Sequence, residues 1–204
     1  LPRNVWAVGF TSLFMDVSSE MVVYVLPLFL SNVLGVQTSI IGFIDGVAEA
    51  TASILKLFSG WLSDKLGARK WLAVAGYGLS AVVKPFFYFA QGWGTIAGIR
   101  WVDRVGKGIR TAPRDALVAD STTQEMRGLA FGFHRAMDTA GALIGLVIAA
   151  LVVWFVQKEN MDLSRSTFQI IVLFSLIPAF LAVISLAIGA KDVPVLEKRE
   201  VPRF

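Results

Sequence analysis

Long apolar stretches constrain the fold of this chain more than any other feature. A helix needs roughly 20 mostly apolar residues to cross a lipid bilayer, and six segments of the 204-residue sequence reach that length. They cover approximately residues 5–30, 39–62, 71–90, 94–113, 128–156 and 168–190. The stretches between them are rich in Gly, Ser, Thr or charged residues, as loops usually are. We therefore predict an all-α membrane protein with six transmembrane helices within residues 1–190, followed by a cytoplasmic tail or linker over 191–204.

The composition excludes several classes of protein. Hydrophobic residues make up 55% of the chain and charged residues 17%, whereas a soluble domain has about a quarter charged residues. The absence of cysteine excludes disulfides, thiolate metal sites and a cysteine nucleophile. The sequence also contains no nucleophile elbow, phosphate-binding glycine loop or metalloprotease helix. We expect a protein that is not an enzyme and that needs no cofactor or resident metal.

The distribution of positive charge predicts how the chain lies in the membrane. If the amino terminus is cytoplasmic, the inner segments hold ten Lys and Arg residues and the outer loops hold two, Lys158 and Arg165. Cytoplasmic loops of membrane proteins carry such an excess of positive charge. We therefore predict an integral protein of the bacterial inner membrane with both termini in the cytoplasm. This topology also explains the net charge of +4 without a nucleic-acid partner.

Charged residues inside the predicted spans indicate a polar interior. A charge at the centre of a bilayer costs about 2.5–3.5 kcal/mol, so such residues face a partner or a water-filled cavity. The spans contain Lys56, Lys84, Arg100, Arg104, Lys107, Arg110, Arg135, Asp16, Glu20, Asp45, Glu49, Asp103 and Asp138. A polar interior in a helical membrane bundle is typical of a transport path.

The fourth predicted span carries the highest density of positive charge. Its basic residues recur at helical spacing on one stripe, together with one threonine: Arg100, Arg104, Lys107, Thr111 and Arg114. At 3.6 residues per turn this stripe extends over about 21 Å of the helix axis. Such a stripe is suited to the wall of a cavity that attracts anions. We predict that Arg100, Arg104 and Lys107, with Asp103 beside them, bind the substrate.

The same charges have a structural alternative. Arg110 and Arg114 are long enough to snorkel to the cytoplasmic headgroups. The two arginines farther from the cytoplasm would then form ion pairs with Asp103 and Asp16.

Acidic residues in the first two spans are spaced one helical turn apart. Asp16 lies near the middle of the first span and is followed by Glu20. A carboxylate at that depth must be protonated or paired with a cation. Asp16 and Glu20 are therefore candidates for proton coupling, and a fixed salt bridge between Asp16 and the fourth span is the alternative. Glu20, Asp45 and Glu49 lie nearer the outer surface, and lining its vestibule is the alternative role for these three residues.

The fifth span places a histidine and an aspartate on one helical face. His134 and Asp138 are four residues apart, a spacing that suits a proton relay or, with further carboxylates, a metal site. We add both residues to the proton-coupling candidates. The alternative is that His134 has a purely structural role.

Glycine and proline predict two local features of the helices. Gly141 and Gly145 form a small-xxx-small pattern, which predicts close contact with another helix. Pro85 follows Lys84 within the third span and predicts a kink there.

The segment GWLSDKLGARK, between the second and third spans, relates this chain to a family. Its spacing of Gly60, Asp64, Gly67, Arg69 and Lys70 resembles the signature loop of the major facilitator superfamily. The resemblance implies an amino-terminal half of six helices, built as two inverted three-helix repeats. It also implies that these five residues form a cytoplasmic latch, which holds the two halves together in the outward-facing state.

The fourth span shows a second resemblance to the same family. Members carry an arginine in this span followed by a glycine-bearing segment, and Arg100 with Gly106 and Gly108 fits that pattern. Asp103 and Arg104 stand where the family often has glutamine and glycine. The substrate site of this family lies at mid-membrane between two halves, which rock to alternate access.

Together these features predict a secondary active transporter of a small anionic or zwitterionic solute, with proton coupling as the role of the intramembrane carboxylates. The expected partners are the solute, protons, the lipid bilayer and a second six-helix half. That half comes from the same chain beyond Phe204, from a second copy or from another subunit. The alternatives are a metal, cation or drug exporter of the same fold, and a non-transporting scaffold subunit of a membrane complex.

Overall fold

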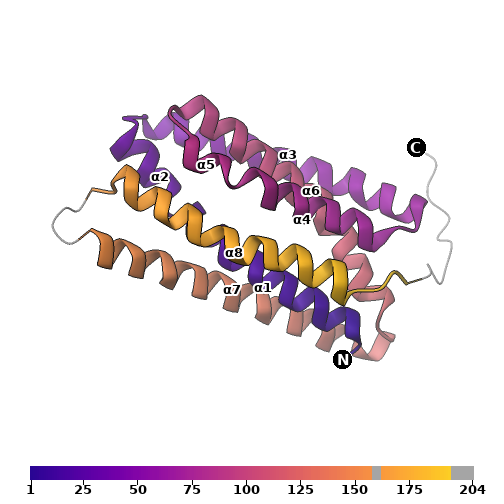
Figure 1. Cartoon of the computed structure of the whole chain (residues 1–204). Coiled ribbons are helices and arrows are strands. Elements are labelled where there is room, and N and C mark those ends of the chain that lie inside the picture. The colour runs from indigo at the N-terminus through magenta and orange to yellow at the C-terminus, as the bar shows by residue number, and fades with distance from the viewer. Residues whose placement is uncertain (158–161, 194–204) are drawn as a thin grey trace.

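The chain forms six long helices joined by short connections (Figure 1). The computed structural model describes residues 1–157 and 162–193. The long helices are α1 (Arg3–Val23), α3 (Thr38–Leu66), α4 (Arg69–Val83), α6 (Trp93–Asp120), α7 (Arg127–Val156) and α8 (Arg165–Gly189). Four shorter elements lie between them, namely α2 (Leu26–Leu28), the π-helix η1 (Phe29–Val33), α5 (Phe86–Phe89) and the 3₁₀-helix η2 (Gln124–Met126). The described residues contain no strand, and the prediction of an all-α protein with six long helices is confirmed.

Two prolines interrupt the helices of the predicted first and third spans. Pro27 lies in the short helix α2, between α1 and the π-helix η1. Pro85 lies between α4 and α5, so the predicted kink at this position is confirmed. Proline lacks a backbone N–H and clashes with the preceding turn, which bends or ends a helix.

Hydropathy separates the six long helices into two kinds. Four helical stretches are long and apolar enough to cross a membrane: Arg3–Val33, Arg69–Phe89, Gln124–Val156 and Arg165–Gly189. The other two long helices, α3 with 29 residues and α6 with 28, carry more charge. They pack against each other, which allows their charged side chains to face a protein partner instead of lipid.

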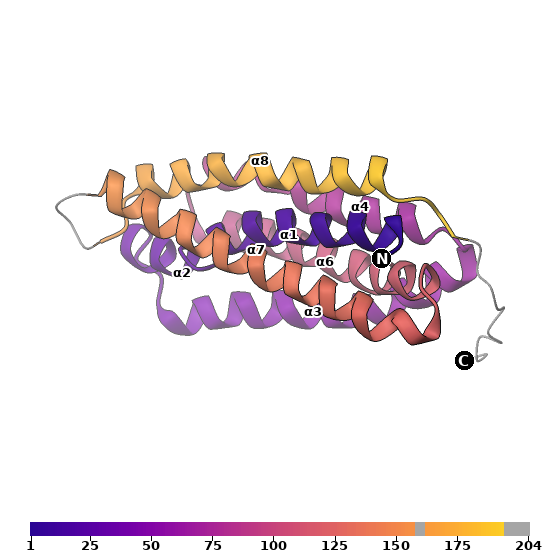
Figure 2. The same cartoon turned by 90° about the horizontal axis from the view of Figure 1, so that it is seen from below.

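The six helices form two groups of three (Figure 2). In one group α1 packs against α7 and α8, and in the other α6 packs against α3 and α4. Contacts between α4 and α8 join the groups. Exchanging α1 with α6, α3 with α7 and α4 with α8 turns each of these contacts into another contact of the set or leaves it unchanged. The packing therefore has the symmetry of two three-helix repeats.

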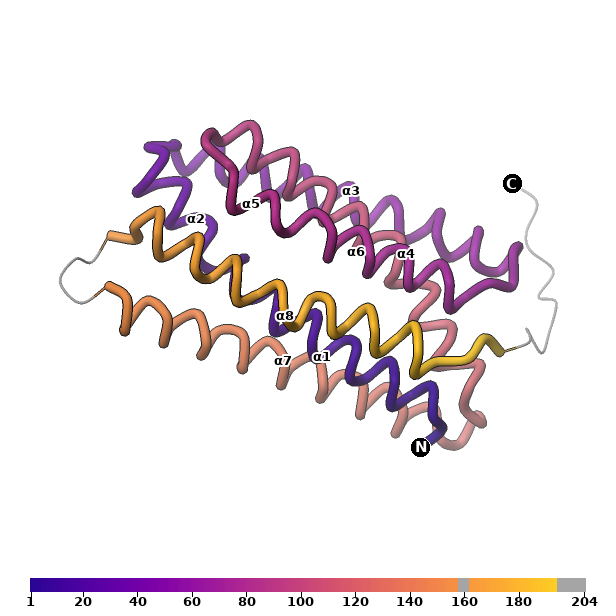
Figure 3. The backbone as a smooth tube through the Cα atoms, in the orientation of Figure 1, coloured from indigo at the N-terminus to yellow at the C-terminus, as the bar shows by residue number. Residues whose placement is uncertain are grey.

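The two repeats run in opposite directions through the bundle (Figure 3). The start of α1 lies beside the end of α8, where the Asn4 side-chain amide donates a hydrogen bond to the Lys191 carbonyl oxygen at 2.9 Å. The start of α6 lies at the other end, where Arg165 at the beginning of α8 donates a hydrogen bond to the Ala90 carbonyl oxygen at 3.0 Å. The first helix of each repeat therefore begins on a different side, as expected of inverted repeats.

Glycines permit the closest contacts between helices. A Cβ atom at Gly76 of α4 would lie 2.7 Å from both the backbone nitrogen of Arg110 and the backbone oxygen of Gly106 in α6. Gly141 and Gly145 of α7 lie directly against the backbone of α1. The close helix contact predicted from the spacing of these two glycines is confirmed.

Gly76→Ala is expected to lower the thermal unfolding midpoint of the protein purified in detergent, because the added Cβ has no room against α6. Overpacking of this kind costs about 1–3 kcal/mol. Gly78→Ala on the same helix is the matched control, since nothing lies within 4 Å of a Cβ there and Ala is the better helix former by about 1 kcal/mol. Equal shifts for the two variants would contradict the close contact between α4 and α6.

Candidate functional site

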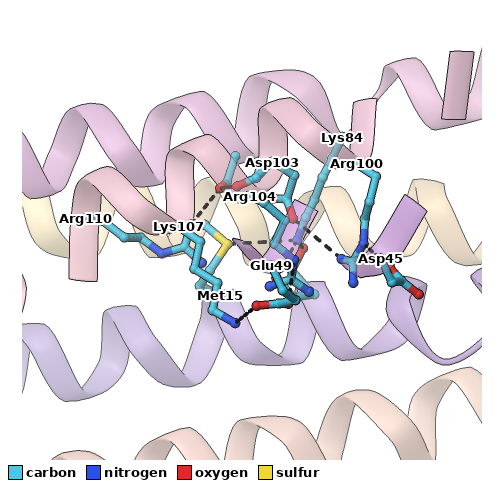
Figure 4. Close-up of polar contacts among 12 residues, drawn as sticks. Met15, Asp45, Glu49, Lys84, Arg100, Asp103, Arg104, Lys107 and Arg110 are labelled. Atoms are coloured by element: carbon cyan, nitrogen blue, oxygen red, sulfur yellow. Dashed lines mark hydrogen bonds and ion pairs between the residues drawn. The ribbon is translucent and has the colours of Figure 1, made fainter. Parts of the chain in front are cut away.

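Ionisable side chains from three helices gather around α6, where it packs against α3 and α4 (Figure 4). We call this set the charged cluster; it consists of Asp45 and Glu49 of α3, Lys84 at the end of α4, and Arg100, Asp103, Arg104, Lys107 and Arg110 of α6. With every group ionised, it holds five positive and three negative charges, a net charge of +2. All four predicted substrate-binding residues belong to it.

Arg100 lies between two carboxylates. Its Nε donates a hydrogen bond to Asp45 Oδ1 at 3.0 Å, and its Nη1 lies 3.9 Å from Asp103 Oδ2. The Arg100 side chain is buried, whereas Asp45 is partly exposed. The ion pair with Asp103 that the structural alternative predicts is present, but the closer partner comes from α3.

Arg104 and Lys107 share one carboxylate. Arg104 Nε lies 3.0 Å from Glu49 Oε1, and Lys107 Nζ lies 3.8 Å from Glu49 Oε2. The part of the structural alternative that paired the two arginines farther from the cytoplasm with Asp16 is therefore wrong, because Asp45 and Glu49 of α3 are the partners. Asp45 and Glu49, predicted only to line a vestibule, are the partners of the α6 arginines. One signal in the sequence agrees with this pairing: the two acidic residues are four residues apart, and so are Arg100 and Arg104.

Arg110 is buried in the bundle. Its side chain is 7% exposed, its Nη1 donates a hydrogen bond to Ser80 Oγ at 2.6 Å, and its guanidinium lies 4.6 Å from the centre of the Tyr77 ring. The prediction that Arg110 snorkels to the headgroups is wrong, because a hydroxyl and an aromatic face of α4 hold it inside.

Lys84 is a second buried cation whose hydrogen-bond partners are neutral. It is 3% exposed, and its Nζ donates hydrogen bonds to Ser18 Oγ and, at 3.2 Å, to Ser19 Oγ in α1. Across residues 1–157 and 162–193, no carboxylate oxygen lies within 4 Å of the charged nitrogens of Lys84 or Arg110. A buried cation without a direct ion pair is costly. These two residues therefore carry the part of the cluster's positive charge that no carboxylate of the described residues pairs directly.

A second polar network joins four helices around Ser12. Ser12 Oγ lies 2.8 Å from His134 Nε2 and 3.3 Å from Tyr77 Oη, and it accepts a hydrogen bond from Arg114 Nη1 at 3.4 Å. His134 Nε2 lies 3.6 Å from Asp138 Oδ1. The network connects α1, α4, α6 and α7. Arg114 therefore points into the bundle instead of toward the headgroups.

The acidic residues and the histidine do not converge on a metal site. In the part of the chain that the structure describes, no group of three or more His, Asp or Glu side chains is placed to hold a metal ion. Asp45 is paired with Arg100, and His134 has a single carboxylate neighbour, Asp138. The five residues that a metal or cation transporter of this fold would use therefore do not form one site in the described part of the chain; they are Asp16, Glu20, Asp45, His134 and Asp138.

Asp16 and Glu20 lie on α1 without a fixed partner. Both are partly exposed, and neither forms a hydrogen bond or an ion pair with another described residue. The predicted alternative of a fixed salt bridge between Asp16 and the fourth span is therefore not observed. Asp16 keeps a free carboxyl group near the middle of its helix.

The connection between α3 and α4 is organised by a buried arginine. Arg69 Nη2 lies 3.2 Å from Asp64 Oδ1, and Arg69 Nε lies 2.8 Å from Asp120 Oδ2 at the end of α6. Gly67 ends α3 with φ 64°, a left-handed conformation that glycine adopts without strain. Sequence reasoning missed Asp120, since no local pattern relates it to this loop.

The other two residues of the predicted latch contact neighbouring elements. A Cβ atom at Gly60 would lie 3.3 Å from Ala112 Cβ of α6. The backbone N–H of Lys70 donates a hydrogen bond to Asp192 Oδ1 at 3.0 Å. The loop therefore binds α3, α4, α6 and the residues after α8 together at one end of the bundle.

Arg69→Gln is expected to lower the thermal unfolding midpoint, because it leaves Asp64 and Asp120 without their shared cation. A buried polar group that loses its partner costs about 1–3 kcal/mol. Arg69→Lys should recover only part of the loss, since an ammonium group lacks the fork of donors that serves two carboxylates. Lys65→Gln is the control, because Lys65 is exposed and lies only over the Trp61 ring. Equal losses for Arg69→Gln and Lys65→Gln would contradict this role of Arg69.

The fold matches that of solved membrane transporters. A bacterial homologue of the human lysosomal transporter Spinster, in an inward-facing and occupied conformation, has a TM-score of 0.74 with this chain. The two are 14% identical, and the match covers 93% of this chain and 44% of that structure. At this identity the likeness shows a shared fold.

Sequence comparison shows the family. An uncharacterized MFS-type transporter of Methanocaldococcus jannaschii is 37% identical over 186 residues, which cover 91% of this chain and 44% of that protein. The multidrug resistance protein MdtH of Photorhabdus laumondii is 30% identical over 130 residues, or 62% of this chain and 30% of that protein. The chain thus spans less than half the length of these relatives. The family profile described as Major Facilitator Superfamily matches residues 8–203, and this integral membrane chain belongs to that family of transporters.

Proposed function

We propose that this chain is the amino-terminal half of a secondary transporter that moves a small anionic or zwitterionic solute by alternating access. The observation that carries the proposal is the pair of buried cations, Arg110 and Lys84, which have no carboxylate within 4 Å among the described residues. Buried positive charge attracts anions and opposes cations in a cavity of low dielectric. A solute with a carboxylate or phosphate group would supply the counter-charge that the charged cluster lacks.

The other half of the cavity is proposed to follow in the same polypeptide. The chain spans 44% of the Methanocaldococcus relative, and the binding site of this family lies between two six-helix halves. The signature loop, with Arg69 between Asp64 and Asp120, is proposed to form the cytoplasmic latch between those halves together with Gly60, Gly67 and Lys70.

Proton coupling is the second part of the proposal. The free carboxyl group of Asp16, with Glu20 one turn away, is able to exchange a proton without breaking an ion pair. Ser12 lies one turn from Asp16 on the other side and contacts His134, which is paired with Asp138. These residues supply a polar route along α1 toward Asp16.

A multidrug exporter is the second candidate function. The 30% identity to a protein named for multidrug resistance favours it. The net charge of +2 on the charged cluster opposes lipophilic cations as its cargo. The two candidates therefore differ in the charge of the transported molecule.

The central test is uptake into proteoliposomes that contain the complete protein. We expect uptake of at least one member of an anion panel (phosphate, sulfate, succinate, citrate) and no uptake of the lipophilic cation tetraphenylphosphonium. Arg110→Gln should lower anion uptake by about tenfold or more, since hydrogen bonds to charged groups contribute roughly 1.5–3 kcal/mol. Arg127→Gln removes the same charge from an exposed position and should leave uptake unchanged.

Two results of this assay would contradict the proposal. One is transport of the cation with no transport of anions, which would favour the exporter. The other is equal anion uptake by the wild-type protein and the Arg110→Gln variant, provided that both unfold at similar temperatures.

The proposed second half is tested by the intact mass of the protein purified from its own cells. A single chain of about twice 22.2 kDa is expected, because the family cavity needs two six-helix halves. A 22.2 kDa chain would contradict the proposal that the second half follows in the same polypeptide.

A further inference from the structure

We propose that Glu49 is a built-in substitute for the anionic group of the substrate. An oxyanion enters the site by replacing the Glu49 carboxylate at Arg104 and Lys107, and Glu49 returns when the oxyanion leaves. This inference rests on the proposed transport of an anionic solute, and it names the group that the substrate displaces.

The geometry of Glu49 is that of a ligand held by two cations. Its Oε1 lies 3.0 Å from Arg104 Nε, and its Oε2 lies 3.8 Å from Lys107 Nζ. Each carboxylate oxygen thus faces a different positive charge. A carboxylate or phosphate group of a solute presents the same pair of oxygens to a guanidinium and an ammonium.

The three side chains differ in exposure. The Arg104 side chain is 9% exposed, whereas Glu49 is 50% exposed and Lys107 is 44% exposed. The Arg104 guanidinium is therefore buried in the bundle, and the Glu49 carboxylate reaches it from the exposed side of α3. A solute that approaches from this side meets Glu49 first.

The contact between Glu49 and Arg104 is also poorly aligned. Arg104 Nε is buried and donates no hydrogen bond of good geometry to any described residue, although Glu49 Oε1 lies 3.0 Å away. Arg100 differs, because its Nε donates an aligned hydrogen bond to Asp45 and its Nη1 has Asp103 as a second carboxylate. The Asp45 pair is therefore the permanent contact between α3 and α6, and the Glu49 pair is the exchangeable one.

Exchange of one anion for another keeps the charge of the cavity wall nearly constant. A buried cation that loses its carboxylate partner is costly, so an empty transporter in which Arg104 lacked Glu49 would resist a change of conformation. Glu49 supplies the missing charge in the empty protein, and the substrate supplies it in the loaded one. The ligand class that fits this exchange is a small oxyanion with a carboxylate or phosphate group.

The test is isothermal titration calorimetry on the intact purified protein with phosphate, sulfate, succinate and citrate. Glu49→Gln and Glu49→Ala should each bind the preferred anion about fivefold more tightly than the wild type, because the competing carboxylate of a half-exposed pair is gone. Arg104→Gln should weaken binding by about tenfold or more. Asp162→Asn is the control, since it makes the same change of net charge at an exposed loop residue and should leave the affinity unchanged.

The outcomes separate this inference from the function on which it rests. Wild-type binding with equal or weaker binding by both Glu49 variants would overturn the exchange and leave anion transport intact. Tighter binding by Asp162→Asn as well would also overturn it, because the gain would then come from net charge alone. Failure of every anion to bind the wild type and all variants would overturn the proposed function together with the inference.

Discussion

The pairing of α3 with α6 decides where charge can lie in this bundle. Either helix alone carries too many ionised side chains to face lipid at the usual cost of about 2.5–3.5 kcal/mol for a central charge. Gly108 of α6 lies directly against the backbone of Ala52 in α3, and Ser59 donates a hydrogen bond to the Gly108 carbonyl oxygen at 2.9 Å. This close approach brings the carboxylates of α3 within reach of the arginines of α6.

The carboxylates of the charged cluster neutralise only part of its positive charge, and the excess positive charge distinguishes this site. Three carboxylates face five cations, so the charged cluster keeps a net charge of +2. Lys84 and Arg110, which form no ion pair with a described carboxylate, are held by hydroxyl groups and an aromatic ring. These groups stabilise a charge without cancelling it. The fold thus supplies a buried positive region at the junction of its two helix groups, where Lys84 of α4 reaches Ser18 of α1.

Much of the fold is predictable because its signals are local. The length of each mostly apolar segment predicts a long helix. Pro85 predicts the break after α4, and Gly141 with Gly145 predicts a close contact of α7 with another helix, which is α1. The ion-pair partners inside the site are harder to predict from the sequence, because they depend on how each helix is rotated about its axis. The matching of Glu49 to Arg104 and of Asp120 to Arg69 follows from that rotation. The four-residue spacing shared by the acidic pair of α3 and the basic pair of α6 permits the first match without specifying it, and no spacing along the chain indicates the second.

The same limit explains the errors about Arg110 and Arg114. A long basic side chain near the end of a span has two favourable places, the headgroups and a polar interior. Ser80 and Tyr77 on α4 and Ser12 on α1 make the interior favourable here. These residues precede the fourth span in the sequence and carry no charge, so a search for counter-ions passes over them.

The most direct measurement is an experimental structure of the intact protein with selenate bound, located by its anomalous scattering. Our account predicts selenate within hydrogen-bond distance of Arg104 Nε and Lys107 Nζ, with the Glu49 carboxylate turned away from both. Selenate elsewhere in the protein, with Glu49 still about 3.0 Å from Arg104 as here, would contradict it.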